Sequence, residues 1–217
     1  MIHDIDSALR GLIEDEVLDG AAVDIDFAAP TKDWAARRNS PTIDVYLYDI
    51  RQDVTRRAFG RVERRDDGRV TERRPVPQWF RLSYLVTAWT QRPEDEHRLL
   101  SDLLACFLAH DFIPAERLEG PVTELGLSVP IGVALPPSQD RSLSDVWSAL
   151  GGELKPSLDI AIIAPLLPAT DYPVGPPVTH EPGLRFLARE SGEEIESVDP
   201  RPVTDGARRR GRIAEVS

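Results

Sequence analysis

The chain has 217 residues, of which 41% are hydrophobic, and its 37 acidic against 26 basic side chains give a formal charge of −11. An apolar share of about 47%, glycine included, is typical of a globular chain and excludes wholesale disorder. The acid excess argues against a protein that holds nucleic acid by general charge, because phosphate neutralisation needs a basic face, and against adsorption to an anionic membrane.

Cysteine content, the N-terminus and the apolar runs bear on the compartment. Cys106 is the sole cysteine, so no intrachain disulfide is possible and no oxidising compartment is implied. The first residues carry Asp4 and Asp6 where a signal peptide would carry basic side chains. The longest apolar stretch, 160–169, is too short to span a bilayer. We therefore expect a soluble, cytoplasmic protein without direct membrane insertion.

The first part of the chain predicts one helix followed by two strands. Apolar residues recur at helical spacing over 2–19, and Gly20 ends this amphipathic helix. Apolar and polar residues then alternate over 23–27 and again over 43–48, which is the period of a half-buried strand. The residues between these strands, 30–41, predict a loop.

Residues 51–78 differ in character from the rest of the chain, and we name them the basic arm. Nine arginines against five acids give the arm a net charge of +4, which leaves −15 for the remainder. Asp67-Gly68 is a strong hairpin-turn signal near its middle. Because apolar residues are sparse, the arm buries no core of its own and should project as a hairpin that orders against something else.

The sequence after the arm predicts strands and helices in alternation. Residues 79–90 are rich in aromatic and β-branched side chains, as in a strand, and Pro93 opens an amphipathic helix with three acids in its first turn. The further elements are a weaker strand candidate, a capped short helix and a last core strand, at 122–129, 143–150 and 157–164.

Together these elements predict a mixed α/β (α+β) fold. We expect a mostly antiparallel sheet flanked by the N-terminal helix and a long second helix, with a protruding β-hairpin arm. Residues 1–165 would form the core domain with the arm, and 166–217 a proline-rich, partly extended C-terminal tail. Short strands over 184–188 and 195–198 would form only with a partner edge.

The templates for catalysis and metal binding find no match in the sequence. It has no nucleophile elbow, phosphate-cradling loop or dinucleotide fingerprint, and its four histidines include no i,i+4 pair. Cys106 lies on an apolar helix face, where a buried, inert thiol is expected. Asp24 and Asp26 share one strand face and should face solvent, whereas the odd spacing of Asp44 and Asp49 puts them on opposite faces. We predict no catalytic, cofactor-binding or metal-binding residue.

The arginines of the basic arm are the predicted partner-binding residues. A solvated charged face and nucleic-acid binding are the alternatives, but the arm has a single aromatic, Phe59, to stack on bases. Arginine suits ion pairs with carboxylates, so docking onto an acidic protein surface is the favoured interpretation. The predicted residues are Arg56, Arg57, Arg61, Arg64, Arg65, Arg69, Arg73 and Arg74.

Three segments in succession carry a family resemblance. They are PTIDVYLYDIRQD (41–53), FRLSYLVTAWTQRPEDEHRLLSDLLACFLAHDFIP (80–114) and DVWSALGGELKPSLDIAIIAPL (145–166). With the leading helix and its acidic turn, they resemble the cap, or tail-terminator, proteins of phage-tail-like contractile injection systems. Trp89 and Trp147 lie in these segments, and we predict core aromatics, with interface anchors as the alternative.

The resemblance implies a structural protein that forms a six-fold homo-oligomeric ring and closes the distal end of an inner tube and contractile sheath. Such a ring ends polymerisation and fixes particle length, with the sheath protein and the inner tube protein as partners. The family has no catalytic residues to carry over, which implies no enzyme activity and no cofactor. The alternatives are an adaptor that links the tail end to a membrane-side component through residues 166–217, and a hydrolase with an unrecognised site.

Overall fold

A computed structural model describes residues 1–66, 69–135, 142–167 and 172–173, and for 62, 64–66, 69–72, 74 and 172–173 it describes the backbone alone. The chain divides after Pro173 into two units, Met1–Pro173 and Val174–Ser217. All that follows concerns the first unit. The strands predicted over 184–188 and 195–198 lie outside the described residues.

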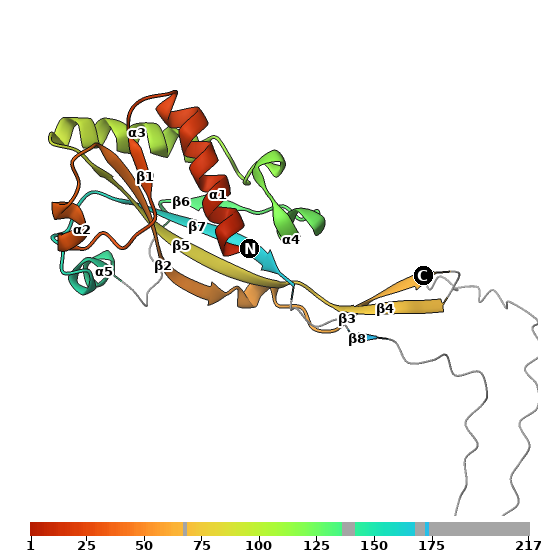
Figure 1. Cartoon of the computed structure of the whole chain (residues 1–217). Helices are drawn as coiled ribbons and strands as arrows, with labels where there is room; N and C mark the ends of the chain where they lie inside the picture. The colour runs from red at the N-terminus through yellow and green to blue at the C-terminus, as the bar shows by residue number, and fades with distance from the viewer. Residues whose placement is uncertain (67–68, 136–141, 168–171, 174–217) are drawn as a thin grey trace, which may run out of the picture. The chain divides into compact units, whose positions relative to one another are not determined.

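Five strands form the main sheet, in the spatial order β1-β2-β5-β7-β6 (Figure 1). They are β1 (Asp24–Asp26), β2 (Thr42–Gln52), β5 (Gln78–Trp89), β6 (Ile131–Val133) and β7 (Leu158–Leu166). The β1–β2 pair is parallel, and the pairs β2–β5, β5–β7 and β6–β7 are antiparallel. The predicted α/β fold with a mostly antiparallel sheet is confirmed.

One face of the main sheet carries the hydrophobic core. Leu82, Tyr84 and Val86 alternate along β5 onto this face and are fully buried. Two helices lie over it, α1 (Ile2–Ile13), which continues in a π-helical turn (Glu14–Leu18), and α3 (Pro93–Leu108) (Figure 1). The Tyr84 hydroxyl donates to Asp6 Oδ1 at 2.8 Å, which fastens α1 to the sheet. Both predicted helices are confirmed.

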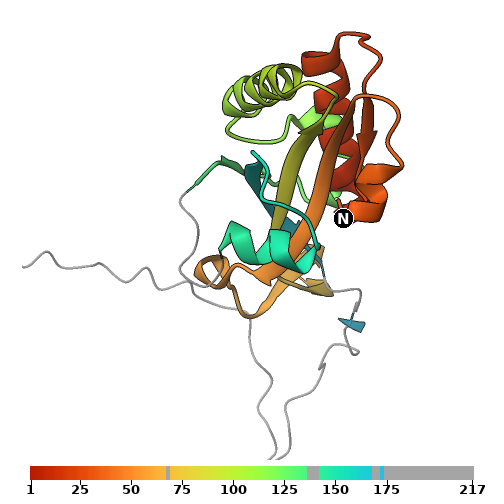
Figure 2. The same cartoon turned by 90° about the vertical axis from the view of Figure 1, so that its left-hand side faces the viewer.

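The opposite face of the main sheet is more polar, and two short helices cover part of it. These are α2 (Lys32–Ala36) and α5 (Leu143–Ala149), the second seen in front of the sheet in Figure 2. Trp34 of α2 and Trp147 of α5 each contact Trp89 of β5, with ring centroids 5.4 and 6.5 Å apart respectively. Trp147 is 2% exposed, which agrees with the prediction of a core aromatic, whereas Trp89, for which the same was predicted, is only partly buried.

Two predicted elements differ from the structure. The prediction of a strand over 122–129 was wrong, because this stretch begins inside α4 (Gly120–Glu124) and continues without a strand. Val122 and Val129 are both buried, but they reach the core from a helix and from an extended segment. The loop expected over 30–41 contains α2, whose first turn is capped where the Thr31 hydroxyl accepts from the Trp34 amide at 3.2 Å.

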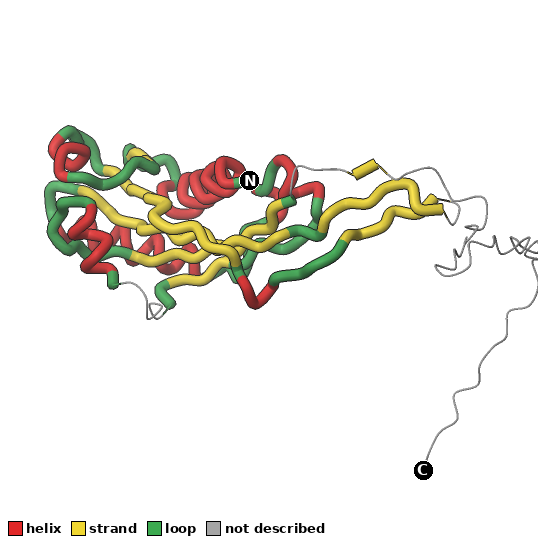
Figure 3. Tube along the Cα trace, turned by 90° about the horizontal axis from the view of Figure 1, so that it is seen from below, coloured by secondary structure: helices red, strands yellow, loops and turns green. Residues whose placement is uncertain are grey.

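A second, three-stranded sheet has the order β3-β4-β8. Strands β3 (Arg61–Asp66) and β4 (Arg69–Pro75) form the predicted hairpin, and β8 (Tyr172–Pro173) pairs with β4. Figure 3 shows this hairpin continuing past the ends of β2 and β5. Single 3₁₀ turns, η2 (Val54–Arg56) and η3 (Ala115–Arg117), complete the described elements.

Candidate interaction site

The basic arm leaves the main sheet between the ends of two neighbouring strands. Gln52, the last residue of β2, donates through Nε2 to Oε1 of Gln78, the first residue of β5, at 2.9 Å. One residue further out, the Asp53 amide donates to the Trp79 carbonyl at 2.8 Å. The base of the arm is therefore fixed to the sheet by both side-chain and main-chain bonds.

The turn η2 forms the first part of the arm and is capped by Asp53. The Asp53 carboxylate accepts from the Thr55 hydroxyl at 2.6 Å and from the Thr55 amide at 3.0 Å. The hydroxyl bond is the main reason that the pKa of Asp53 is lowered, and the charge of Arg56 adds to it. The capping carboxylate is thus ionised at neutral pH and can hold the turn.

Two arginines of the arm lie over aromatic rings. The Arg56 guanidinium is 5.2 Å from the centre of the Trp79 ring, and its Nε is 3.5 Å from Asp53. The Arg57 guanidinium is 4.6 Å from the centre of the Phe59 ring. Cation–π contacts of this kind orient a guanidinium while its N–H donors stay at the edge of the plane. Residues 54–60 are all exposed, so this part of the arm faces solvent.

The hairpin carries the other predicted arginines. Glu63 and Arg73 are cross-strand partners, and their side chains form an ion pair at 3.2 Å. Arg61 is exposed at the start of β3. The structure places the remaining predicted arginines on the backbone of the two strands, Arg64 and Arg65 on β3, and Arg69 and Arg74 on β4. The eight predicted residues therefore lie on one hairpin and on the segment that leads into it.

Strand β8 was not predicted, and it pairs with β4, so that β4 is not an edge strand of the arm sheet. Tyr172 pairs with Arg73 and Pro173 pairs with Glu72. A two-residue strand that contains proline has no periodic signal, because its pairing depends on a segment about a hundred residues away in the sequence. Within the described residues, β3 is the outer strand of this sheet on the other side.

A cavity of about 390 Å³ opens on the polar face beside the base of the arm. Arg51 and Arg81 line it, together with Tyr48 and Asp159. The Tyr48 hydroxyl donates to Asp159 at 3.1 Å; burial and this neighbouring carboxylate raise the pKa of Tyr48 to about 12. Tyr48 is therefore neutral at physiological pH. Arg51 pairs with Asp49 at 2.8 Å, so the wall of the cavity carries charges of both signs.

The predicted placement of two aspartates was wrong. A β-bulge between Leu47 and Asp49 puts Asp49 opposite Ser83, whereas Asp44 lies opposite Thr87. Because Ser83 and Thr87 share a face of β5, Asp44 and Asp49 share a face of β2 as well. A regular strand, which the sequence pattern assumes, would have placed them on opposite faces.

Asp44 is a fully buried carboxyl group. Among the described residues neither of its side-chain oxygens has a hydrogen-bond partner. Burial, reinforced by the charge of the neighbouring Asp26, raises the pKa of Asp44 to about 8, although Arg38 opposes this shift. The group is thus mostly protonated at neutral pH.

Asp26 is the register partner of Asp44 on β1 and has the opposite character. It accepts from Trp34 Nε1 at 2.9 Å and pairs with Arg38 at 3.1 Å. Burial works against ionisation here, but hydrogen bonds from Trp34 and from two backbone amides, with the charge of Arg38, lower the pKa of Asp26. Asp24 is exposed, as predicted, whereas Asp26 binds α2 instead of facing solvent freely.

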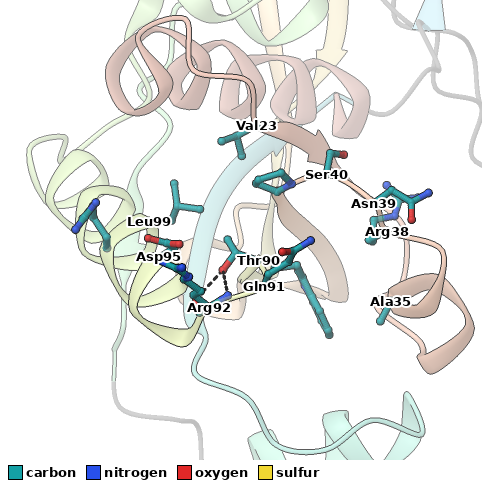
Figure 4. Close-up of a pocket in the computed structure, with 13 residues that line it drawn as sticks. Val23, Ala35, Arg38, Asn39, Ser40, Thr90, Gln91, Arg92, Asp95 and Leu99 are labelled. Atoms are coloured by element: carbon teal, nitrogen blue, oxygen red, sulfur yellow. Dashed lines mark hydrogen bonds between the residues drawn. The ribbon is translucent and has the colours of Figure 1, made fainter.

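A larger cavity, of about 660 Å³, lies where the loop after α2, the end of β5 and the start of α3 meet (Figure 4). Trp89 and Leu99 supply apolar wall, while Arg92 and Asp95 supply charge. The Thr90 hydroxyl donates to the Arg92 carbonyl at 2.7 Å and accepts from the Arg92 amide at 3.3 Å, the bonds drawn in Figure 4. The lining residues form no nucleophile–base pair, so this cavity offers no catalytic arrangement.

Cys106 is buried on α3, as predicted. Its sulfur lies 3.8 Å from Glu16 Oε2; burial and this carboxylate raise the pKa of the thiol to about 11. A protonated, buried thiol is a poor nucleophile. Among the described residues, no group of three or more His, Cys, Asp or Glu side chains could hold a metal ion. No described helix combines the length and the apolar character that a membrane crossing requires.

The class of the chain is therefore a mixed α/β domain that bears a basic β-hairpin arm. The chain belongs to the Pvc16 N-terminal domain family, whose model matches residues 4–180. The resemblance to the cap and tail-terminator family is thereby confirmed. Among curated proteins, none matches this chain.

Two solved structures share the fold. One is the sheath/tube terminator of PVC, an extracellular contractile injection system, in its extended state, with a TM-score of 0.62 and 20% identity over 88% of this chain. The other is the tube-terminating cap of the anti-feeding prophage, with a TM-score of 0.60 and 20% identity over 85% of this chain. The chain spans 65% and 62% of the length of these two proteins.

Proposed function

We propose that this chain is a structural terminator, which caps the distal end of the inner tube and contractile sheath of a contractile injection system. The observation that carries this proposal is the match of most of the chain to one fold shared with a sheath/tube terminator and with a tube-terminating cap. The role is not enzymatic and needs no cofactor. Assembly takes place in the cytoplasm, where the tube and sheath are built.

The physical task of a terminator defines what its surfaces must do. A growing tube or sheath ends in an unpaired surface, and the terminator must match that surface on one side without offering a copy of it on the other. Heterologous contacts between identical subunits achieve this when they close into a ring instead of an open helix. We propose a six-fold ring, with the sheath protein and the inner tube protein as its partners.

Negative-stain imaging of the purified full chain tests the ring directly. We expect closed particles with six-fold symmetry, and the same mass by light scattering at several protein concentrations. A chain that stays monomeric at the concentrations used for imaging would contradict the proposed ring.

The basic arm is the element that we propose to reach the last layer of sheath or tube. Its net charge of +4 on a chain of −11 favours an acidic partner surface. The strand β3 is the outer strand of the arm sheet within the described residues, so strand addition at that edge would supply main-chain bonds to the partner.

Reversal of Arg64, Arg65, Arg73 and Arg74 to glutamate should release length control. The variant should form the same ring, but like charges at the contact should weaken capping by at least about 30-fold, because such juxtaposition costs several kcal/mol. Particle lengths measured by electron microscopy should become broad. A control variant reverses three arginines that are exposed outside the arm, Arg37, Arg92 and Arg98, and should keep normal lengths. Normal capping by the arm variant would refute the role of the arm.

A further inference from the structure

Phe59 stands out among the exposed apolar residues because of where it lies. Its side chain is 80% exposed, the largest value among the large hydrophobic residues whose side chains the structure describes, and Val54 in the same segment is 70% exposed. Single exposed apolar side chains are normal on any protein surface. Phenylalanine and arginine are, however, both enriched in protein–protein interfaces relative to the rest of a protein surface.

The backbone on the two sides of this exposed ring has specific features. The Ala58 carbonyl, immediately before Phe59, accepts from Gln78 Nε2 at 3.1 Å, and Gln78 is itself bonded to Gln52. Gly60, immediately after it, has a φ of 119°, a backbone conformation that side chains with a Cβ rarely adopt. The hydrogen bond to Ala58 restricts the backbone beside the ring, and Gly60 permits the turn that leads into β3. Restricted backbone freedom lowers the entropy lost when a partner buries the ring.

Arg57 lies over the Phe59 ring. Its guanidinium lies 4.6 Å from the centre of the Phe59 ring. When a guanidinium lies over a ring, its N–H donors remain at the edge of the guanidinium plane. There they are free to donate to a partner's carboxylates beside the ring. A partner surface that buries Phe59 would therefore bring its own border next to Arg57. Acidic side chains on that border could accept from the guanidinium.

We propose that Phe59 is the apolar anchor of the basic arm, and that it enters an apolar socket rimmed by carboxylates on the last protein layer of the particle end that the chain caps. This inference rests on the proposed terminator function, which supplies the partner. Phe59 contributes affinity by losing water-exposed apolar area, and Arg56 and Arg57 contribute by pairing with the rim. The two contributions differ in salt dependence, because salt screens exposed ion pairs and leaves apolar burial intact.

The test measures binding of the full-length chain to sheath–tube particles assembled in cells that lack it. Phe59→Ser should weaken capping about 10- to 100-fold, the loss expected when one buried phenylalanine is removed, while Phe59→Leu should retain most of it. The loss caused by Phe59→Ser should be as large at high salt as at low salt, and that caused by Arg57→Gln should shrink at high salt. Leu154→Ser is the matched control, since Leu154 is 69% exposed outside the arm.

The outcomes separate this inference from the proposed function. If the wild-type chain caps particles and Phe59→Ser caps them equally well, the anchor is refuted and the terminator stands. If the wild-type chain does not bind particle ends at all, the terminator function itself is refuted. Because Phe59 is exposed, the melting temperature of Phe59→Ser should match that of the wild type, which distinguishes lost binding from lost folding.

Discussion

Replacing Trp147 with alanine should lower the stability of the domain by about 3–5 kcal/mol, the usual loss for a buried tryptophan. Trp147 is 2% exposed on α5 and contacts the Trp89 ring, and a Cβ at Gly152 would lie 3.1 Å from its ring, so the site is closely packed. At about 2–4 °C per kcal/mol for a domain of this size, the melting temperature should fall by roughly 6–20 °C. Differential scanning calorimetry measures this directly.

Trp147→Phe provides the matched variant. Trp147 Nε1 is buried without a hydrogen-bond partner among the described residues, so phenylalanine keeps much of the apolar contact and removes an unsatisfied donor. We expect a clearly smaller loss of stability than for alanine. If Trp147→Ala instead kept the wild-type melting temperature but no longer formed the six-fold ring of subunits, Trp147 would be an interface anchor.

The stability of Asp44→Asn relative to the wild type should increase as the pH rises from acidic to alkaline values. The folded state keeps the proton of Asp44 up to a pH of about 8, whereas the unfolded chain releases it near the ordinary pKa of 3.8. Between these values the folded state binds more protons, so wild-type stability falls as pH rises, by about 1.4 kcal/mol per pH unit from this group. Asparagine cannot ionise and should remove this slope.

The measurement is the difference in melting temperature between Asp44→Asn and the wild type at several pH values from 5 to 9. The charged groups that face Asp44 are Asp26 on β1 and Arg38 after α2, and both stay unchanged in the variant. Asp102→Asn serves as the control, because Asp102 is exposed on α3 and should give a small difference that does not grow with pH. A difference for Asp44→Asn that is constant across this range would contradict a neutral, buried Asp44.

Local patterns in the sequence predicted most of the fold. The helices of 2–19 and from Pro93 follow from apolar spacing, and the hairpin follows from Asp67-Gly68 between two charged runs, because these signals need no distant partner. The short elements were harder to predict from the sequence. The three-residue strand β6 and the five-residue α4 exist through contacts with β7 and the core, so the spacing of Val122 and Val129 predicted a strand instead.

The site divides in the same way. The arginines of the basic arm are visible in the sequence as a run, and the structure places them on one hairpin and the segment before it. The burial of Asp44 is not visible, because it depends on β1, where Asp26 is its register partner, and on Arg38 after α2, which lie elsewhere in the sequence. The face of Asp49 is not visible either, because it depends on the bulge in β2. The segment that carries Phe59 is bonded to the sheet through Gln78, about twenty residues away in the sequence, which no periodic pattern connects to it.

Particle length is the measurement that tests the terminator most directly. Cells that produce the tube and sheath of the same system should be imaged with and without this chain, and the lengths of individual particles measured. We predict one narrow length distribution with the chain present, and broad distributions with uncapped ends when it is removed, restored by supplying the full chain. A length distribution that stays narrow in its absence would contradict the proposed function.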